Sequence, residues 1–322
     1  MRVLILGATG FVGRHLLTEC ASHGDALGGT FCPGEPIPAR EGVSWHLMDL
    51  LDSDSIRDAL SAFRPEGIVH LAGQANVALA AKDPVGSFRV NAEGTVRVLE
   101  GVREVCPGVR VVAVTSAEVY GEVPAADLPV TEARPPVPRS AYGLSKAAAD
   151  LAAAQAAAGW GLDVVRMRPF NHVGPGQRRG FVAPDFASQV AGIERAEAPP
   201  VLRVGNLSAR RDFTDVRDIV KAYRVALERG ASGSVYNLCS GRSVPVEQIV
   251  QLLMEAASVP ITMETDPARF RPVDVPEFLG DPTRARDDLS WEAVIPLEQS
   301  ISDVLEEWRA LPSGASDSEA GS

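Results

Sequence analysis

Two hydrophobic periods alternate along the first half of the chain. Short apolar runs typical of buried strands are followed by longer stretches in which apolar residues recur every three or four positions, as in helices. The predicted strands are Val3–Leu6, Leu27–Phe31, Val43–Leu47, Gly67–Leu71, Val109–Thr115 and Leu162–Arg168, and the predicted helices are Phe11–Ser22, Ser53–Phe63, Asp83–Val105 and Tyr142–Trp160. Strands that alternate with helices at this spacing favour a doubly wound α/β fold around a parallel sheet.

The second half of the chain is less regular. Proline and glycine cluster at 169–180, 199–200 and 266–282, and the clearest predicted elements are a helix at Ile219–Arg229, a strand at Val235–Leu238 and a helix at Val246–Ala257. We interpret this half as a smaller α+β unit interleaved with the sheet. The expected division is 1–168 with about 212–240 for the sheet unit, and 169–211 with 241–310 for the smaller unit. The tail 311–322 has almost no apolar residues and is expected to be disordered.

Composition and charge exclude several classes of protein. The 322 residues carry 31 basic and 42 acidic side chains, a net charge of −11, so the chain has no basic footprint for nucleic acid or an anionic membrane surface. No apolar run reaches the roughly 18 residues of a membrane span, and the N-terminal segment does not read as a signal peptide. The four cysteines are widely spaced, which favours reduced thiols over disulfides or a metal site and predicts a cytoplasmic protein.

A glycine-rich turn follows the first predicted strand and opens the first helix. In LILGATGFVGRHL, Gly7 permits the tight turn, Gly10 lets the backbone approach a pyrophosphate, and Gly13 lets helix and strand pack closely. The helix N-terminus adds free N–H groups and a positive dipole. This predicts a Rossmann-type dinucleotide site; the alternative is a turn without ligand. The residues expected to line it are Gly7, Thr9, Gly10, Phe11, Val12, Gly13 and Arg14.

A tyrosine and a lysine stand four positions apart in SAYGLSKAAADLA. Tyr142 and Lys146 share one face of a predicted helix, and a nearby cation is expected to lower the pKa of the phenol. Ser116 follows an apolar strand, so its hydroxyl is expected at the carboxyl edge of the sheet, where ligands bind in open α/β sheets. Alone, the Tyr–Lys spacing is common; after the glycine turn and the strand-end serine it predicts a catalytic constellation.

Over about residues 1–300 the chain resembles the extended short-chain dehydrogenase/reductase enzymes that act on nucleotide sugars. The resemblance rests on the GxxGxxG turn, Ser116 and the YxxxK pair. It implies that Tyr142 passes a proton to or from a sugar oxygen, that Ser116 positions this oxygen, and that Lys146 supports the tyrosine and holds the nicotinamide ribose. It further implies cofactor contacts from Asp49, Leu50, Leu71, Ala72, Gly73, Tyr142, Lys146 and Pro169, with a loop cap as the alternative for Asp49. It also implies a structural role for Asn91 in stabilising the central sheet.

The residue at the end of the second predicted strand is expected to determine whether the chain binds NAD or NADP. An acidic residue there binds the ribose 2′-hydroxyl, and an arginine accepts a 2′-phosphate. The chain has Thr30-Phe31-Cys32-Pro33 at this place, and Glu35 comes late, after Pro-Gly. Because Arg14 follows the third glycine directly, we interpret the pattern as NAD or NADP with a preference for NADP. A solvated helix position is the alternative for Arg14.

Glu118 follows Ser116 by two residues. In dehydratases of the same family a glutamate at this position serves elimination across C5–C6, and Ala117 replaces the aspartate typical of the dTDP-glucose branch. Glu118 therefore suits the GDP-mannose group, although reductases of that group carry it as well. The alternative is a strand-end glutamate satisfied by backbone N–H groups.

The substrate half resembles the GDP-6-deoxy-D-mannose reductase and GDP-mannose 4,6-dehydratase group. The matching strings are RPFNHVGPGQRRG from Arg168, VGNLSARRDFTDVRDIVKAY from Val204 and RPVDVPEFLGDPTRARDD from Arg271. They imply substrate contacts from Asn171, Arg178, Val182, Arg211, Arg271 and Glu277. The arginines would give an acidic protein one basic pocket for a nucleoside diphosphate; surface salt bridges are the alternative. Asp215 and Asp218 are expected to cap a helix that starts near Val216.

The resemblance implies reduction of the 4-keto group of GDP-4-dehydro-6-deoxy-D-mannose with NAD(P)H, giving GDP-6-deoxymannose (GDP-rhamnose) or its C4 epimer. A GDP-mannose 4,6-dehydratase is the second hypothesis and a nucleotide-sugar 4-epimerase the third. A regulator that binds the cofactor without chemistry is disfavoured, because both Tyr142 and Lys146 are present. The Ala-rich helix after Ser140 corresponds to the family's dimer interface, which predicts a homodimer; burial inside the monomer is the alternative.

Overall fold

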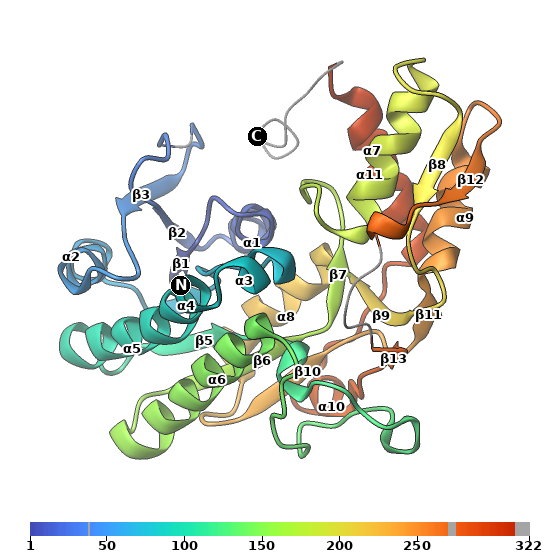
Figure 1. The fold of residues 1–322 in the computed structure, drawn as a ribbon. Helices are drawn as coiled ribbons and strands as arrows, with labels where there is room; N and C mark the ends of the chain where they lie inside the picture. Colours follow the sequence, from blue (N-terminus) through green and yellow to red (C-terminus); the bar gives the residue numbers. More distant parts are fainter. Residues whose placement is uncertain (38, 270–274, 313–322) are drawn as a thin grey trace.

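The computed structural model describes residues 1–37, 39–269 and 275–312. Its largest element is a seven-stranded parallel sheet in the order β10-β6-β5-β4-β1-β2-β3 (Figure 1). The strands are β1 (Arg2–Leu6), β2 (Ala26–Phe31), β3 (Val43–Leu47), β4 (Gly67–His70), β5 (Arg110–Val114), β6 (Val164–Pro169) and β10 (Val235–Leu238). The strand order reverses beside β1, which makes the sheet doubly wound as predicted.

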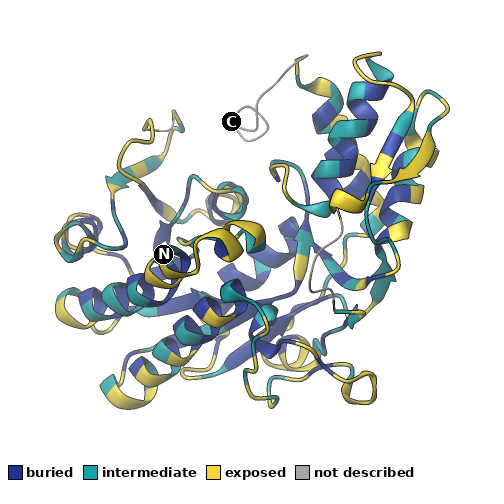
Figure 2. Cartoon of the chain, in the orientation of Figure 1, coloured by how far each residue is buried: buried dark blue, intermediate teal, exposed yellow. Residues whose placement is uncertain are grey.

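Helices cover both faces of this sheet, because its central strands are apolar on both sides. Val3 and Ile5 of β1 pack with one helix set, whereas Leu4 and Leu6 pack with the other, as the two-residue period of a strand requires. The first set is α1 (Phe11–Ser22), α8 (Val216–Arg229) and α10 (Thr283–Leu289), and the second is α2 (Ser53–Phe63), α5 (Gly94–Val105) and α6 (Ala141–Trp160). Most of the sheet between them is buried, whereas the edge strand β3 is partly exposed (Figure 2).

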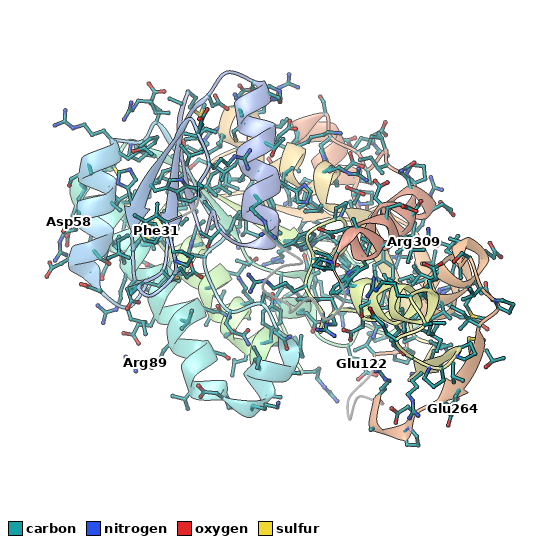
Figure 3. All side chains as sticks on the ribbon, turned by 90° about the horizontal axis from the view of Figure 1, so that it is seen from above. Phe31, Asp58, Arg89, Glu122, Glu264 and Arg309 are labelled. Atoms are coloured by element: carbon teal, nitrogen blue, oxygen red, sulfur yellow. The ribbon has the colours of Figure 1, made fainter. Side chains whose placement is uncertain are left out.

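The smaller part is built on two short sheets and three helices. Strand β9 (Arg210–Asp215) pairs with β7 (Asn171–Val173), β11 (Ser243–Pro245) and β13 (Glu277–Phe278), and β8 (Val201–Val204) pairs with β12 (Thr262–Thr265). Helices α7 (Val182–Glu194), α9 (Val246–Ala256) and α11 (Leu297–Ala310) share a third apolar core with β8. Seen from above, Asp58 and Arg89 lie on the side of the large sheet, and Glu264 and Arg309 lie on the other (Figure 3).

The two parts are interleaved along the sequence. After the chain has formed β7, α7, β8 and β9, it returns to the large sheet through α8 and β10. It returns again through α10, where Ala285, Leu289 and Trp291 join the apolar core around α8. This last segment lies within 241–310, the range that the sequence assigns to the smaller unit.

The predicted helix Asp83–Val105 is interrupted in the structure. It consists of α4 (Pro84–Phe88), a π-helical turn at Arg89–Glu93 and α5. A π turn carries one extra residue and is common at functional sites. Here it contains the buried Asn91, whose amide bonds Gln74 after β4 and the Ser145 hydroxyl of α6. Asn91 thus has a structural role, as expected, but it joins a loop to a helix rather than acting within the sheet.

The expected caps of α8 divide into one that is confirmed and one that is wrong. Asp215 accepts a hydrogen bond from the Arg217 backbone N–H at 2.8 Å and caps the helix, which begins at Val216. Asp218 lies inside the first turn and instead accepts the backbone N–H groups of Val294 and Ile295, both at 2.8 Å. Its partners lie 76 and 77 positions along the chain, which no local capping pattern reveals.

Two predictions fall on residues that the structure does not describe. They are the substrate contact of Arg271 and the tail beyond residue 312. Within the part of the chain that the structure describes, no helix is long and apolar enough to cross a membrane. In the same part, no cluster of histidine, cysteine and carboxylate side chains suited to a metal ion is present.

Candidate active site

The glycine turn has the shape of a phosphate cradle. Gly7 adopts a left-handed φ of +82°, and a Cβ at this residue would lie 2.8 Å from the backbone of Ala72. A Cβ at Gly13 would lie 2.4 Å from the Gly7 carbonyl oxygen, so side chains are excluded where helix α1 meets the turn. At Gly10 the nearest atom is 3.4 Å away, which leaves that face of the turn open to a ligand. The tight turn at Gly7 and the close packing at Gly13 are as the spacing predicts, and the approach of a pyrophosphate to Gly10 stays a prediction.

A cleft of about 1950 Å³ runs from this turn across the carboxyl edge of the large sheet to the smaller part. Both parts of the molecule line it. Of the residues predicted from the sequence, the cleft is lined by Gly7, Thr9, Gly10, Phe11, Val12, Gly13, Arg14, Leu71, Gly73, Ser116, Glu118, Tyr142, Lys146, Pro169, Asn171, Arg178, Val182 and Arg211. One cleft thus combines the proposed cofactor, catalytic and substrate residues.

Ser116, Tyr142 and Lys146 meet at the floor of the cleft. Strand β5 ends at Val114 and is followed by Thr115 and then Ser116. The Tyr142 hydroxyl is hydrogen-bonded to the Ser116 side chain. Ser140 caps α6 by accepting the Gly143 N–H at 3.0 Å, so the first turn of this helix is fixed where Tyr142 leaves it. One turn further, the Lys146 Nζ donates to the Val114 carbonyl at 3.3 Å. All three side chains are more than nine-tenths buried.

The pKa of Tyr142 moves opposite to the direction expected from the sequence. Burial raises it to about 12; the hydrogen bond with Ser116 opposes this effect, and the charge of Glu118 adds to it. Burial also lowers the pKa of Lys146 to about 8, because a charged amine is disfavoured away from water. The expectation that Lys146 lowers the phenol pKa is therefore wrong for this structure. In consequence Tyr142 keeps its proton at neutral pH and is in the form that can donate it.

A buried ionic network holds the catalytic helix against the sheet. Asp150, two turns after Tyr142 on α6, accepts from Arg168 of β6 at 3.0 and 2.6 Å, from Arg166 at 2.9 Å and from the Thr115 hydroxyl at 3.1 Å. Thr115 directly precedes Ser116. Asp150 thus ties the helix that carries Tyr142 to the strand end that carries Ser116, and it does so without contact with bulk solvent.

The site fits a dinucleotide on observations independent of the motif. Besides the glycine cradle, the Tyr223 hydroxyl lines the cleft fully buried and has no hydrogen-bond partner among the described residues. Buried polar groups are almost always paired, so this orphaned hydroxyl indicates a missing ligand or water at the cleft wall. Tyr223 could not be predicted from the sequence, because nothing in its helical pattern distinguishes it from a core residue.

Arg14 is hydrogen-bonded to the smaller part of the molecule. Its guanidinium donates to the Gly176 carbonyl at 3.1 Å, in the loop that precedes α7, and the Gly176 N–H donates to Glu307 of α11 at 2.6 Å. Burial and the neighbouring Arg178 lower the pKa of Arg14, whereas Glu307 raises it. Arg14 lines the cleft from this position, and its contact with a 2′-phosphate stays a prediction.

Three of the residues predicted to contact the cofactor make contacts within the chain itself. Asp49 accepts the Leu51 N–H at 2.9 Å in its own loop, which is the capping role weighed as the alternative. Leu50 packs against Gly94, and Ala72 packs against Gly7. Their contacts with a cofactor stay predictions.

The basic side chains gather at the substrate end of the cleft. Arg211 is half-buried and donates to the carbonyls of Arg210 and Val275 at 2.8 and 2.7 Å, and Arg178 is exposed. Glu277 turns away from this role: it pairs with Arg210 at 3.3 Å and accepts from the Ser243 hydroxyl. Four further cations line the cleft and were not predicted from the sequence: Arg40, Lys82, Arg139 and Arg269. The only signal for these cations in the sequence is the position of Arg139 directly before Ser140, which caps α6.

Known proteins resemble this chain over nearly its whole length. A family model described as GDP-mannose 4,6 dehydratase matches residues 4–304. The chain belongs to this family. It is 34% identical to the GDP-6-deoxy-D-mannose reductase of Pseudomonas aeruginosa over 309 residues, which cover 96% of this chain and 97% of the relative.

Solved structures of related enzymes have the same fold. The structure of RMD from Pseudomonas aeruginosa complexed with NADPH matches with a TM-score of 0.83 and 32% identity, covering 96% of this chain and 99% of that one. The UDP-glucose 4-epimerase of Thermus thermophilus complexed with NAD matches with a TM-score of 0.86 and 27% identity over 96% and 99% of the chains.

This member of the GDP-mannose 4,6-dehydratase family is an NAD(P)-dependent nucleotide-sugar enzyme of the extended short-chain dehydrogenase/reductase type. The resemblance, the Rossmann-type fold and the class of cofactor expected from the sequence are confirmed.

Proposed function

We propose that the enzyme reduces the 4-keto group of GDP-4-dehydro-6-deoxy-D-mannose with NAD(P)H, giving GDP-6-deoxymannose (GDP-rhamnose) or its C4 epimer. The observation that carries the proposal is the end-to-end similarity to a GDP-6-deoxy-D-mannose reductase, at 34% identity. The match covers almost the full length of both chains, so it includes the part that binds the sugar as well as the part that binds the cofactor.

The catalytic groups suit reduction of a carbonyl. The bound dinucleotide supplies the hydride from its nicotinamide ring. Ser116 and Tyr142 bind the C4 carbonyl oxygen by hydrogen bonds, and Tyr142 donates the proton that this oxygen needs as it becomes a hydroxyl. At neutral pH the Tyr142 phenol carries the proton that this step requires. Lys146, one turn along α6, would hold the ribose of the bound cofactor, and burial brings its pKa to about 8.

The far end of the cleft is proposed to hold the GDP moiety. Arg211 and Arg178 bind the diphosphate, since guanidinium groups match pairs of phosphate oxygens. Asn171 and Val182 line the space between these arginines and the catalytic residues, where the sugar must lie. In this arrangement, 1–168 with about 212–240 bind the cofactor, and 169–211 with 241–310 bind the nucleotide sugar.

The first test is a reaction with purified protein, GDP-4-dehydro-6-deoxy-D-mannose and NADPH or NADH, followed at 340 nm. We expect one cofactor oxidised per sugar consumed, and NMR of the product then assigns the C4 configuration. No oxidation with either cofactor would overturn the proposal. The control is a matched reaction with GDP-mannose as the substrate. A dehydratase would remove water from GDP-mannose without net use of the cofactor.

GDP-mannose 4,6-dehydration is the second candidate function, and the place of Glu118 in the cleft is compatible with it, as it is with reduction. Its carboxylate lines the cleft and acts on the pKa of Tyr142, so it lies within electrostatic reach of the reaction centre. A carboxylate placed there is suited to move the C5 proton and assist departure of the C6 hydroxyl. Water loss from GDP-mannose would support this candidate over the reductase.

We further propose that the enzyme is a homodimer formed through α6 and the adjoining α4. Leu144 and Leu151 lie seven residues apart on α6 and are 54% and 57% exposed, and on α4 Val85 and Phe88 are 71% and 42% exposed. Residues seven apart share one face of a helix, so these side chains form an apolar surface that a second copy would cover.

Light scattering after gel filtration tests this interface. The unmodified protein is expected to have the mass of two chains, and the variant with both Leu144→Glu and Leu151→Glu the mass of one, because four buried carboxylates cannot be paired. Val294→Glu places the same charge at a 60% exposed valine in another part of the fold and is expected to leave the mass unchanged. A monomeric unmodified protein would exclude the interface.

A further inference from the structure

We propose that Glu35 makes the adenosine end of the cleft selective for NAD(H) over NADP(H). Of the two solved structures described above, the reductase holds NADPH and the epimerase holds NAD, so likeness in fold does not decide between the two cofactors. The inference concerns cofactor binding alone, and it stands or falls independently of the reaction proposed above.

Glu35 is returned to the end of β2 by a tight turn. From the sequence it comes too late, after Pro33 and Gly34. In the structure the Glu35 N–H donates to the Cys32 carbonyl at 3.1 Å, and Gly34 has a φ of +88°. Proline followed by a glycine with positive φ is the pattern of a type II β-turn, which reverses the chain. This turn brings the side chain of Glu35 back to the end of β2, although Pro33 and Gly34 separate Glu35 from the strand in the sequence.

The carboxylate is held against the glycine turn. One oxygen, Oε2, accepts from the Thr9 hydroxyl at 3.2 Å and from the Cys32 backbone N–H at 3.1 Å. Thr9 lies between the first two glycines of the phosphate cradle, and both Thr9 and Glu35 line the cleft. An acid at the end of the second strand binds the ribose 2′-hydroxyl in dinucleotide-binding folds. Glu35 therefore occupies the position of that acid with its other oxygen, Oε1, left for the ribose.

The surroundings are unfavourable for a 2′-phosphate. Burial raises the pKa of the Cys32 thiol, and the negative charges of Glu35 and Asp49 raise it further. Both carboxylates thus act on the same small region beside the cleft. A 2′-phosphate placed there would bring up to two further negative charges next to Glu35, whereas a hydroxyl would donate a hydrogen bond to it.

Among the described residues, Arg40 is the cation near the adenosine end of the cleft whose charge could favour a 2′-phosphate against the effect of Glu35. It lines the cleft, and its guanidinium donates to the Arg14 carbonyl at 3.2 Å and to the Thr18 hydroxyl at 2.9 Å. These bonds hold it along helix α1, from which Thr18 projects to the surface. Arg14 itself is turned to the loop at Gly176. We infer that Glu35, which touches the glycine turn, outweighs Arg40 in the choice of cofactor.

Equilibrium binding tests the inference without any substrate. The dissociation constants of NADH and NADPH are measured by calorimetry on the full-length protein and on Glu35→Gln and Arg40→Gln. The unmodified protein is expected to bind NADH about tenfold more tightly, and Glu35→Gln to reduce this ratio toward one by improving NADPH. Arg40→Gln is the matched control and is expected to keep the preference for NADH.

Three results would overturn it: tighter binding of NADPH by the unmodified protein, an unchanged ratio in Glu35→Gln, or a shift toward NADH in Arg40→Gln as large as the opposite shift in Glu35→Gln. Glu35 is exposed, so the variant is expected to fold, and its thermal unfolding midpoint checks this. Competition by adenosine 2′,5′-bisphosphate against 5′-AMP provides a second readout that isolates the 2′-phosphate.

Discussion

Replacing Tyr142 with phenylalanine is expected to lower turnover of the 4-keto sugar by about 100- to 10,000-fold. The change removes the proton donor and its hydrogen bond with Ser116, while the ring stays in its buried place. The measurement is kcat from cofactor oxidation, together with the dissociation constant of NAD(P)H. We expect the binding constant to change little, since the glycine cradle that holds the dinucleotide is untouched.

The control is Tyr236→Phe, the same substitution at a fully buried tyrosine of β10. Its hydroxyl accepts the Ala231 N–H at 3.3 Å, and Tyr236 does not line the cleft. Turnover by this variant should stay near that of the unmodified protein. If Tyr142→Phe kept more than a tenth of the activity, another group, with Glu118 the nearest candidate, would have to deliver the proton.

Replacing Asp150 with alanine is expected to destabilise the protein by about 3–5 kcal/mol. The carboxylate is completely buried and partners Arg168, itself 4% exposed, so its removal leaves a buried guanidinium without a counter-charge. Urea unfolding followed by circular dichroism gives the free energy of unfolding. Any folded fraction should also lose catalytic rate, because Asp150 joins α6 to the strand end beside Ser116.

Asp127→Ala is the matched control for this prediction. Asp127 pairs with Arg134 at 3.0 Å, but the two side chains are 54% and 26% exposed. An exposed ion pair contributes about 0–1 kcal/mol, so this variant should unfold almost like the unmodified protein. Equal losses for Asp150→Ala and Asp127→Ala would show that the buried network does not hold the catalytic helix.

The large sheet could be predicted from the sequence because its strands are apolar on both faces. Val3 to Leu6 read as one buried run, and the structure buries all four residues on its two sides. The small sheets could not be predicted in this way. Strand β9 has the sequence RRDFTD, which carries no apolar alternation, and it is a strand because β7, β11 and β13 pair with it from distant parts of the chain.

In the candidate site, too, local features could be predicted from the sequence, and features that depend on the assembled fold could not. Gly7, Ser116, Tyr142 and Lys146 follow a spacing that local structure fixes, and the cleft brings them together as predicted. Glu35 depended on a turn whose effect on side-chain position is not visible in the linear order of residues. The pKa of Tyr142 depended on burial, which arises only when the whole cleft is assembled.

The edge strand of the large sheet has a consequence for how this protein is made and how it can evolve. Strand β10 is residues 235–238, and β7, α7, β8 and β9 all precede it in the chain. A nascent chain therefore exposes the open edge of β6 until β7, α7, β8 and β9 of the smaller part have left the ribosome. Because the rest of the smaller part follows β10, no single contiguous segment contains that part alone. Exchange of the smaller part with that of a relative would therefore need at least two segments.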